Sequence, residues 1–260
     1  FASTGTKAAV EPVDPFIGTG FHGHTYPGAT VPAGMVQLSP DTRNTGWDGS
    51  SGYHYSDNTI LGFSHTHLSG TGCADLGDFL FTPAIGDVPV KDGAYAVEPL
   101  PFSHQDEMAS PGYYRVRFPE RGITAELTAG PHTGIHRYTF NGKGERHILI
   151  DMRHNIGETM PRDIFLKAVG DTLVQGGRIV DGWTHDRHVF FSARFSVPFT
   201  ACKTEGGDRW LLSFPEDVEE LTVAVGLSPV DTDGAANNRR FEAFGDFYEA
   251  RAAPPRRWGP

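Results

Sequence analysis

The chain has 260 residues, of which 38% are hydrophobic and 21% charged, a composition typical of a soluble, folded domain rather than a disordered chain. Its formal net charge of −10 makes nucleic acid and anionic membranes poor candidates for partners. No apolar run approaches the roughly 18 residues that a membrane-spanning helix needs. The two cysteines, Cys73 and Cys202, allow at most one disulfide and form no CxxC pair.

The first third of the chain differs from the rest. From Asp14 to Asp78 it is dense in glycine, histidine, aromatic and hydroxyl residues and poor in alternating runs. Loops held on a rigid scaffold carry most binding groups in proteins. We therefore expect this stretch to build a site.

Most of the remaining chain reads as short strands. Apolar residues alternate with polar ones from Val189 to Val197, from Leu221 to Ser228 and from Ile123 to Thr128, which places one set on a core face. The sequence predicts further strands over Tyr113–Phe118, Ile135–Phe140, Arg146–Asp151, Ile164–Val169 and Arg209–Phe214.

Turn residues separate these runs. Asn141-Gly142 is a strong signal for a β-hairpin turn, because both residues tolerate positive φ. Many short strands with turn residues between them predict an all-β fold, a large antiparallel β-sandwich.

The end of the chain has a helical pattern from Asp231 to Ala253. Asp231 or Asp233 is suited to cap its start, and Phe241, Phe244, Phe247 and Tyr248 fall at helical spacing. Pro254-Pro255 is expected to end the helix. The simplest partition is a β-sandwich domain over residues 1–230 followed by a linker helix and tail over residues 231–260.

Two His-x-His pairs, His22-Gly23-His24 and His65-Thr66-His67, are candidate metal clamps, because residues i and i+2 of an extended chain point to one side. A mononuclear metal site would also need a carboxylate ligand, and Asp75 and Asp78 are near in sequence. The alternative is that these rings form hydrogen bonds that support glycine-rich loops.

Acid–base chemistry needs paired carboxylates, and the sequence offers a set without singling out a pair: Asp41, Asp48, Asp57, Asp75, Asp78, Asp151 and Glu158. The Gly-x-Ser-x-Gly elbow of α/β hydrolases and the phosphate-binding P-loop are both absent. The glycine run at Gly18-Thr19-Gly20 does not follow a strand and open a helix, so a dinucleotide site is also excluded.

Trp47 stands between Gly46 and Asp48-Gly49 in a polar stretch, where an ordinary core position is hard to build. An exposed indole face packs well on the apolar face of a sugar ring, with the nearby Asp48 and Arg43 available for its hydroxyl groups. The alternative is a tryptophan that plugs one end of the sandwich.

A long run of motifs then points to a family. Val13-Asp14-Pro15-Phe16-Ile17-Gly18-Thr19-Gly20 leads into His22-Gly23-His24-Thr25-Tyr26-Pro27-Gly28-Ala29, and Asp41-Thr42-Arg43, Gly46-Trp47-Asp48-Gly49 and Gly62-Phe63-Ser64-His65-Thr66-His67 follow. Over nearly its whole length the chain resembles the N-terminal domain of glycoside hydrolase family 92, the calcium-dependent exo-acting α-mannosidases.

The resemblance implies a supersandwich, a galactose-mutarotase-like β-sandwich, that packs on a C-terminal (α/α)6 barrel. It implies hydrolysis with inversion, in which an acid protonates the leaving oxygen and a base activates water. In the family the acid, the base and the Ca²⁺ ligands lie in the barrel. We therefore expect no catalytic residue and no metal ligand in this chain, and expect the chain alone to be inactive.

By matching the family's motifs, Arg43, Trp47 and Asp48 are the expected sugar contacts, and the loop at Gly20 and Phe21 is expected to approach the sugar by its backbone. The resemblance implies that His65 and His67 support loops and are not metal ligands. Two departures matter: the family often has glycine where Phe21 stands, and Pro254-Pro255 breaks the linker helix, through either truncation or a shifted reading frame.

The expected partners are mannose-containing glycans, with α-1,2 linkages favoured, and the (α/α)6 barrel. Without the barrel, an uncovered apolar surface predicts self-association of the chain. The expected location is periplasmic or secreted. Two other functions stay open: a free-standing mannose-binding module, and a metalloenzyme built on the His-x-His pairs.

Overall fold

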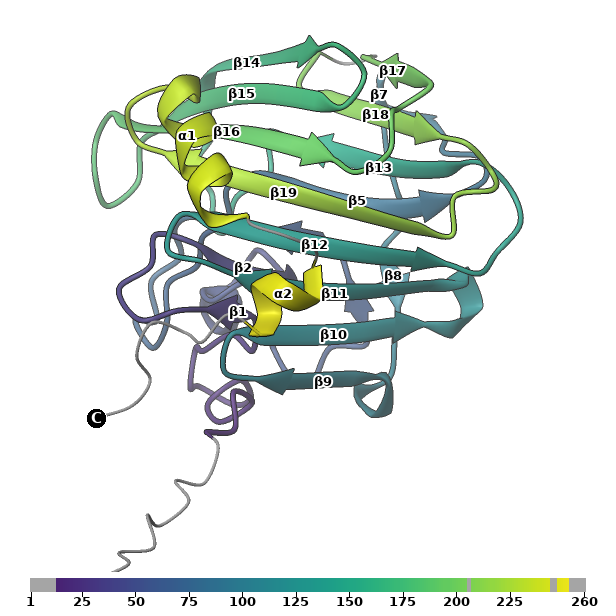
Figure 1. Cartoon of the computed structure of the whole chain (residues 1–260). Helices are drawn as coiled ribbons and strands as arrows, with labels where there is room; N and C mark the ends of the chain where they lie inside the picture. Colours follow the sequence, from purple (N-terminus) through teal and green to yellow (C-terminus); the bar gives the residue numbers. More distant parts are fainter. Residues whose placement is uncertain (1–12, 205–206, 244–246, 253–260) are drawn as a thin grey trace, which may run out of the picture.

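The computed structural model describes residues 13–204, 207–243 and 247–252. Two large antiparallel sheets lie face to face, so the predicted all-β sandwich is confirmed (Figure 1). Each strand turns one set of side chains inward, and the aromatic residues Phe63, Phe81, Tyr138 and Phe191 are fully buried in the core between the sheets.

The eight-stranded sheet carries most of the strands that alternation predicts. Its order is β14-β15-β16-β19-β12-β11-β10-β9. The strands are β9 (Glu107–Ser110), β10 (Tyr113–Phe118), β11 (Ile123–Ala129), β12 (Thr133–Phe140), β14 (Arg162–Val169), β15 (Leu173–Val180), β16 (Arg187–Phe195) and β19 (Glu220–Ser228).

The seven-stranded sheet takes much of its length from the glycine-rich first third. Its order is β1-β2-β4-β5-β13-β18-β17. The strands are β1 (Ala29–Thr30), β2 (Gln37–Asp41), β4 (Gly62–Ser64), β5 (Leu80–Ile85), β13 (Arg146–Asp151), β17 (Ala201–Lys203) and β18 (Arg209–Phe214).

Short elements complete the fold. Two small ribbons pair β3 with β8 and β6 with β7. Their bounds, with those of three 3-10 turns, are β3 (Thr59–Ile60), β8 (Leu100–Pro101), β6 (Val90–Lys91), β7 (Ala94–Tyr95), η1 (Trp47–Gly49), η2 (His104–Asp106) and η3 (Pro119–Arg121).

The hairpin predicted at Asn141-Gly142 is wrong. Strand β12 pairs with β11 and β19, whereas β13 pairs with β5 and β18, so the segment between β12 and β13 crosses from one sheet to the other. The Asn141 N–H donates to the Gly122 carbonyl, and Gly142 lies against Gly122 so closely that a Cβ on Gly122 would collide with it. The two glycines therefore serve a packed crossover instead of a tight turn.

The C-terminal helical region consists of two helices in place of the single helix predicted over Asp231–Ala253. Helix α1 (Thr232–Glu242) begins at Asp231, whose carboxylate accepts from the Gly234 N–H, as expected for an N-cap. It ends where Ala243 leaves the helical conformation, and α2 (Phe247–Ala252) follows. Phe244 and Pro254-Pro255 lie outside the described residues.

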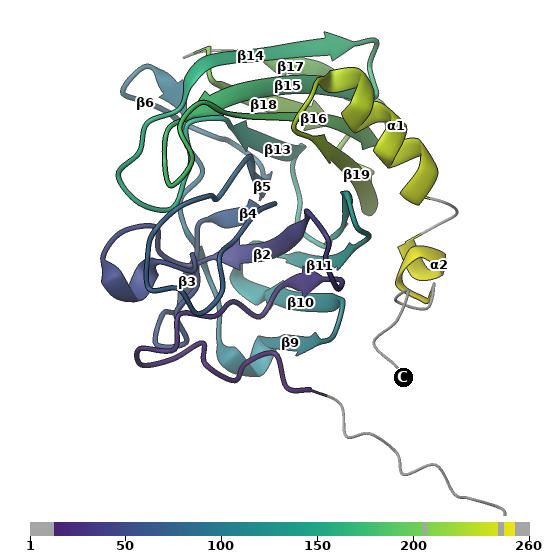
Figure 2. The same cartoon turned by 90° about the vertical axis from the view of Figure 1, so that its left-hand side faces the viewer.

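Both helices cover the outer face of the eight-stranded sheet, whereas η1 and the loops of the first third lie on the other side of the molecule (Figure 2). Helix α1 packs on β19 and β16, and α2 packs on β11 and β12. In the described part of the chain no helix is both long enough and apolar enough to cross a membrane.

Candidate functional site: a histidine, tryptophan and aspartate cluster

The first segment of the site is a tight loop over residues 18–25. The Gly23 N–H donates to the Gly20 carbonyl and the Thr25 N–H donates to the Gly18 carbonyl. Gly23 has no room for a side chain, because a Cβ there would lie 2.2 Å from the Gly18 carbonyl oxygen. Phe21 and His24 both have a φ of 54°, a left-handed conformation that side chains disfavour.

Phe21 holds a left-handed backbone at a position where the family resemblance leads us to expect glycine. Glycine adopts this conformation at no steric cost, whereas phenylalanine has to be held in it. The His54 ring, through Nε2, donates to the Phe21 carbonyl at 3.0 Å and fixes the loop from outside. The Phe21 side chain is 81% exposed.

The second segment is the 3-10 turn η1. Gly46 enters it with a φ of 79°, and the Gly49 and Ser50 N–H groups donate back to the Gly46 and Trp47 carbonyls. This turn projects the Trp47 and Asp48 side chains toward the loop at residues 18–25.

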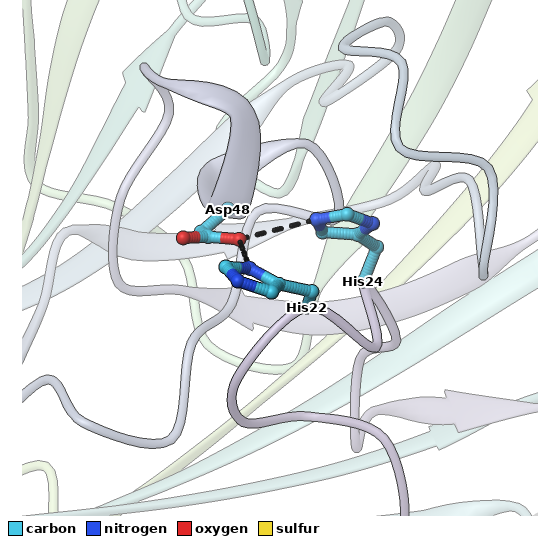
Figure 3. Close-up of side chains that lie close together, drawn as sticks. All are labelled: His22, His24 and Asp48. Atoms are coloured by element: carbon cyan, nitrogen blue, oxygen red, sulfur yellow. Dashed lines mark hydrogen bonds and ion pairs between the residues drawn. The ribbon is translucent and has the colours of Figure 1, made fainter.

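Three side chains converge between the two segments, as Figure 3 shows. One oxygen of Asp48, Oδ1, lies 2.7 Å from Nδ1 of His22 and 3.3 Å from Nε2 of His24. The hydrogen bonds from His22 and His24 outweigh the weaker effect of desolvation and hold the pKa of Asp48 below its ordinary value.

An exposed aromatic surface borders the cluster. The Trp47 indole lies 4.9 Å from the His22 ring and 4.5 Å from the His24 ring, and the Phe21 ring lies 4.2 Å from that of His22. Trp47 is 60% exposed, so the predicted alternative of a tryptophan plugging the sandwich is wrong. Gly72 backs this surface, because a Cβ there would lie 3.0 Å from the indole nitrogen.

Arg43 lies beneath η1, with its aliphatic carbons about 3.1 Å from where a Cβ on Gly49 would stand. Its guanidinium forms a two-pronged ion pair with Asp57 and also reaches Ser56. The hydrogen bond with Asp57 raises the pKa of Arg43, so this cation is held in place by a carboxylate of its own chain.

The second His-x-His pair does not form a clamp, because its two rings point to different partners. His67 donates through Nδ1 to the Gln37 carbonyl and through Nε2 to Asp41, at 2.8 and 2.6 Å. His65 donates through Nδ1 to the Phe79 carbonyl. Both rings are buried, so the interpretation of these histidines as loop supports is confirmed.

A buried carboxylate joins the loops under the site. Asp41 accepts from His67 and, at 2.6 Å, from His154, a histidine that the sequence analysis did not single out. Burial raises the pKa of Asp41, but the positive potential of His67 and the hydrogen bonds from both rings together hold it well below its usual range. Gly52 gives this carboxylate room, because a Cβ there would lie 2.4 Å from Oδ1.

The two aspartates expected beside the histidine pairs have other roles. Asp75 accepts from the backbone N–H groups of Leu76 and Trp183. Asp78 is fully buried and forms ion pairs with Arg178 and Arg187. The carboxylate that meets His22 and His24 is instead Asp48, which nothing in sequence spacing indicated.

The cysteines Cys73 and Cys202 are both free, so the disulfide that the sequence allows does not form. Within the described ranges, His22, His24 and Asp48 form a group of three metal-binding side chains whose ligand atoms lie within 4.8 Å of one another.

Comparison with known proteins places this chain in a family. Residues 12–247 match the glycosyl hydrolase family 92 N-terminal domain. The chain belongs to this family. The family-92 domain matches a family GH92 α-mannosidase of Bacteroides thetaiotaomicron, solved in complex with mannoimidazole, at 36% identity and a TM-score of 0.83. That match covers 94% of this domain and 35% of the solved chain.

Two further relatives agree with this family. A family GH92 inverting mannosidase of Bacteroides thetaiotaomicron VPI-5482 is 27% identical, with a TM-score of 0.74, over 88% of this domain and 33% of that chain. An uncharacterized secreted glycosidase of Arthroderma benhamiae is 31% identical over 132 residues, which are 49% of this domain and 17% of the relative. The family-92 domain thus spans about a third of the solved mannosidases.

Proposed function

We propose that this chain supplies sugar contacts to an exo-acting α-mannosidase that hydrolyses α-mannosides of glycans with inversion. The observation that carries the proposal is the exposed Trp47 indole beside the Asp48 carboxylate, on a surface bordered by the loop at Gly20 and Phe21. An aromatic face packs on the apolar face of a pyranose, while a neighbouring carboxylate accepts its hydroxyl hydrogens.

In the proposed complex, Trp47 forms a wall of the sugar subsite and Asp48 bonds a hydroxyl group. Gly20 and Phe21 approach the sugar through their backbone. Arg43 offers Nη1 to the sugar, because Nε and Nη2 already donate to Asp57 and hold the guanidinium in a fixed position.

We assign the acid and base of the reaction to another part of the enzyme. An inverting hydrolase needs one carboxylic acid with a raised pKa and one carboxylate about 6.5–9.5 Å away. Around this site the pKa shifts run the other way: those of Asp41, Asp48 and Asp57 are all lowered, which keeps these groups ionised. They are suited to bind or support and unsuited to donate a proton.

The same assignment applies to Ca²⁺. Calcium takes six to eight oxygen ligands. The cluster of His22, His24 and Asp48 offers two imidazole nitrogens and one carboxylate, a donor set that does not fit this ion. We propose that the Ca²⁺ of the enzyme binds in a C-terminal (α/α)6 catalytic barrel, which is also the main partner of this domain.

Two finer proposals accompany this one. We propose a preference for α-1,2-linked mannosides and a periplasmic or secreted location. The location is supported by the Arthroderma benhamiae relative, which is named a secreted glycosidase.

The test is a titration of this chain with mannoimidazole and with methyl α-mannoside, followed by tryptophan fluorescence and calorimetry. We expect weak binding that Trp47→Ala lowers at least tenfold, or about 1.4 kcal/mol. Trp183→Ala is the matched control, because Trp183 is 61% exposed on another loop. Equal binding by Trp47→Ala and the unaltered chain would refute the subsite role.

A further inference from the structure

The cluster of His22, His24 and Asp48 has a second chemical capacity besides sugar contact. Two imidazole nitrogens and one carboxylate oxygen are a ligand set typical of Zn²⁺ and its neighbours in the first transition row. The three ligand atoms come from two separate segments, the loop at residues 18–25 and the turn η1, and lie within 4.8 Å of one another.

Two of the three ligand-atom separations are close to those of a metal site, and the third, between Nδ1 of His22 and Nε2 of His24, is at most 4.8 Å. In a tetrahedral site with bonds of ~2.0–2.1 Å, neighbouring ligand atoms are ~3.3 Å apart. Nε2 of His24 already lies 3.3 Å from Oδ1 of Asp48. Nδ1 of His22 lies 2.7 Å from the same oxygen and has to move outward by less than 1 Å. The His22 side chain is 48% exposed, so it has the freedom to do so.

The surroundings hold the ligands and leave one side open. The His24 side chain is only 6% exposed, with its ring packed edge-on against the Trp47 indole at 4.5 Å. His24 has a left-handed backbone, and Nε2 of its ring lies 3.3 Å from Oδ1 of Asp48. Strained conformations of this kind cluster at ligand sites. On the side of the half-exposed His22 the cluster faces solvent, which leaves room for a water or another ligand.

We propose that His22, His24 and Asp48 form a site for a divalent transition metal of the Zn²⁺ class. His22 binds through Nδ1, His24 through Nε2 and Asp48 through Oδ1, and the remaining position is open to solvent. The imidazole nitrogens select against Ca²⁺ and Mg²⁺, which prefer oxygen ligands. This site is separate in chemistry and in residues from the calcium site assigned above to the barrel.

The experiment uses the metal alone. Metal-free chain is titrated with Zn²⁺ by calorimetry and with Co²⁺ by visible absorption, which reports nitrogen and oxygen coordination. We expect one equivalent to bind and Ca²⁺ to give no signal. His22→Gln at an exposed position and His24→Asn, which tolerates the left-handed backbone, are each expected to raise the Kd for Zn²⁺ at least tenfold.

A matched control is His188→Gln, because the His188 ring also meets a carboxylate, that of Asp186, at 3.4 Å, but belongs to no group of three metal-binding side chains among the described residues. This variant is expected to leave the Kd unchanged. Absence of Zn²⁺ binding, or binding that persists in both His22→Gln and His24→Asn, would overturn the proposal.

The metal proposal and the mannoside proposal share Asp48, and their failures are distinguishable. If both hold, Zn²⁺ and mannoside exclude each other, so saturating Zn²⁺ raises the Kd for methyl α-mannoside. Mannoside binding that is lost with Zn²⁺ and restored by a chelator supports both. Zn²⁺ binding with unchanged mannoside affinity supports the metal site and refutes the contact of Asp48 with sugar.

Discussion

Acid should destabilise this domain through a buried pair of histidines. His65 and His136 meet in the core, with their Nε2 atoms 2.9 Å apart. Because the Phe79 carbonyl can only accept, His65 donates to it through Nδ1 and accepts from His136 through Nε2. His136 then accepts from the Tyr138 hydroxyl at Nδ1. Both rings are thus neutral in the folded chain, and no position is left for another proton.

The magnitude follows from the pKa of His65. Burial lowers it from 6.5 to about 4, against the weaker effect of the hydrogen bond to Phe79, and burial also lowers the pKa of His136. Above pH 6.5 neither folded nor unfolded chain binds this proton. Between pH 6.5 and 4 only the unfolded chain does, so stability falls. At pH 5 the loss from His65 alone is about 2 kcal/mol, and His136 adds a loss of the same sign.

The assay is urea denaturation from pH 7.5 to 4.5. We expect the unaltered chain to lose at least about 2 kcal/mol of unfolding free energy by pH 5. His65→Gln is expected to be less stable at pH 7.5 but to lose less on acidification. His185→Gln is the control, since that side chain is 94% exposed.

The buried carboxylates do not contribute to the change in stability between pH 7.5 and 4.5. The pKa values of Asp41 and Asp78 are lowered in the folded chain, so their stabilisation is complete above about pH 4 and is lost only below it. A free energy of unfolding that is flat from pH 7 to 5, or an identical slope in His65→Gln, would refute the reasoning.

Three other predictions concern stability and assembly. Asp78→Asn leaves the buried Arg178 and the partly buried Arg187 without their counter-charge and is expected to cost about 3–5 kcal/mol in urea denaturation. Glu98→Gln, which breaks an exposed pair with Lys91, is expected to leave the free energy of unfolding nearly unchanged, and equal losses in the two variants would contradict the argument. Gly23→Ala is expected to lower the Tm and abolish Zn²⁺ binding, because the new Cβ collides with Gly18. Gly20→Ala is the control and is expected to leave the Tm unchanged, because a Cβ there is in ordinary contact with Tyr55 at 3.5 Å. A larger loss of Tm in Gly20→Ala than in Gly23→Ala would be inconsistent with the loop packing. The isolated chain is expected to self-associate in light scattering, and a monodisperse monomer at high concentration would count against this.

The sequence predicted much of the eight-stranded sheet, because strands such as β11 and β16 alternate apolar with polar residues along the chain. It missed β2, β4 and β5, in which nearly every residue is buried, so no alternation is visible. It also missed β15. The Gly176-Gly177 pair in this strand has no side chains, which leaves space for the rings of Phe190 and Phe191 on the next strand. No local pattern indicates such packing.

The candidate site was predicted in part. The loops around Gly20 and Trp47 were singled out, and the structure brings them together. The partner of the His22 and His24 pair was sought near Asp75 in sequence, but it is Asp48, because η1 folds back onto the first loop. His136 and His154 gave no signal at all, since each is an isolated histidine whose role depends on a partner far along the chain.

We propose that this chain contacts mannosides without hydrolysing them. The most direct measurement is mannose release from α-1,2-mannobiose by this chain alone, first with Ca²⁺ and then with a chelator. We expect no release in either condition. Calcium-dependent release would contradict this proposal, because the acid, the base and the calcium ligands would then lie within these 260 residues.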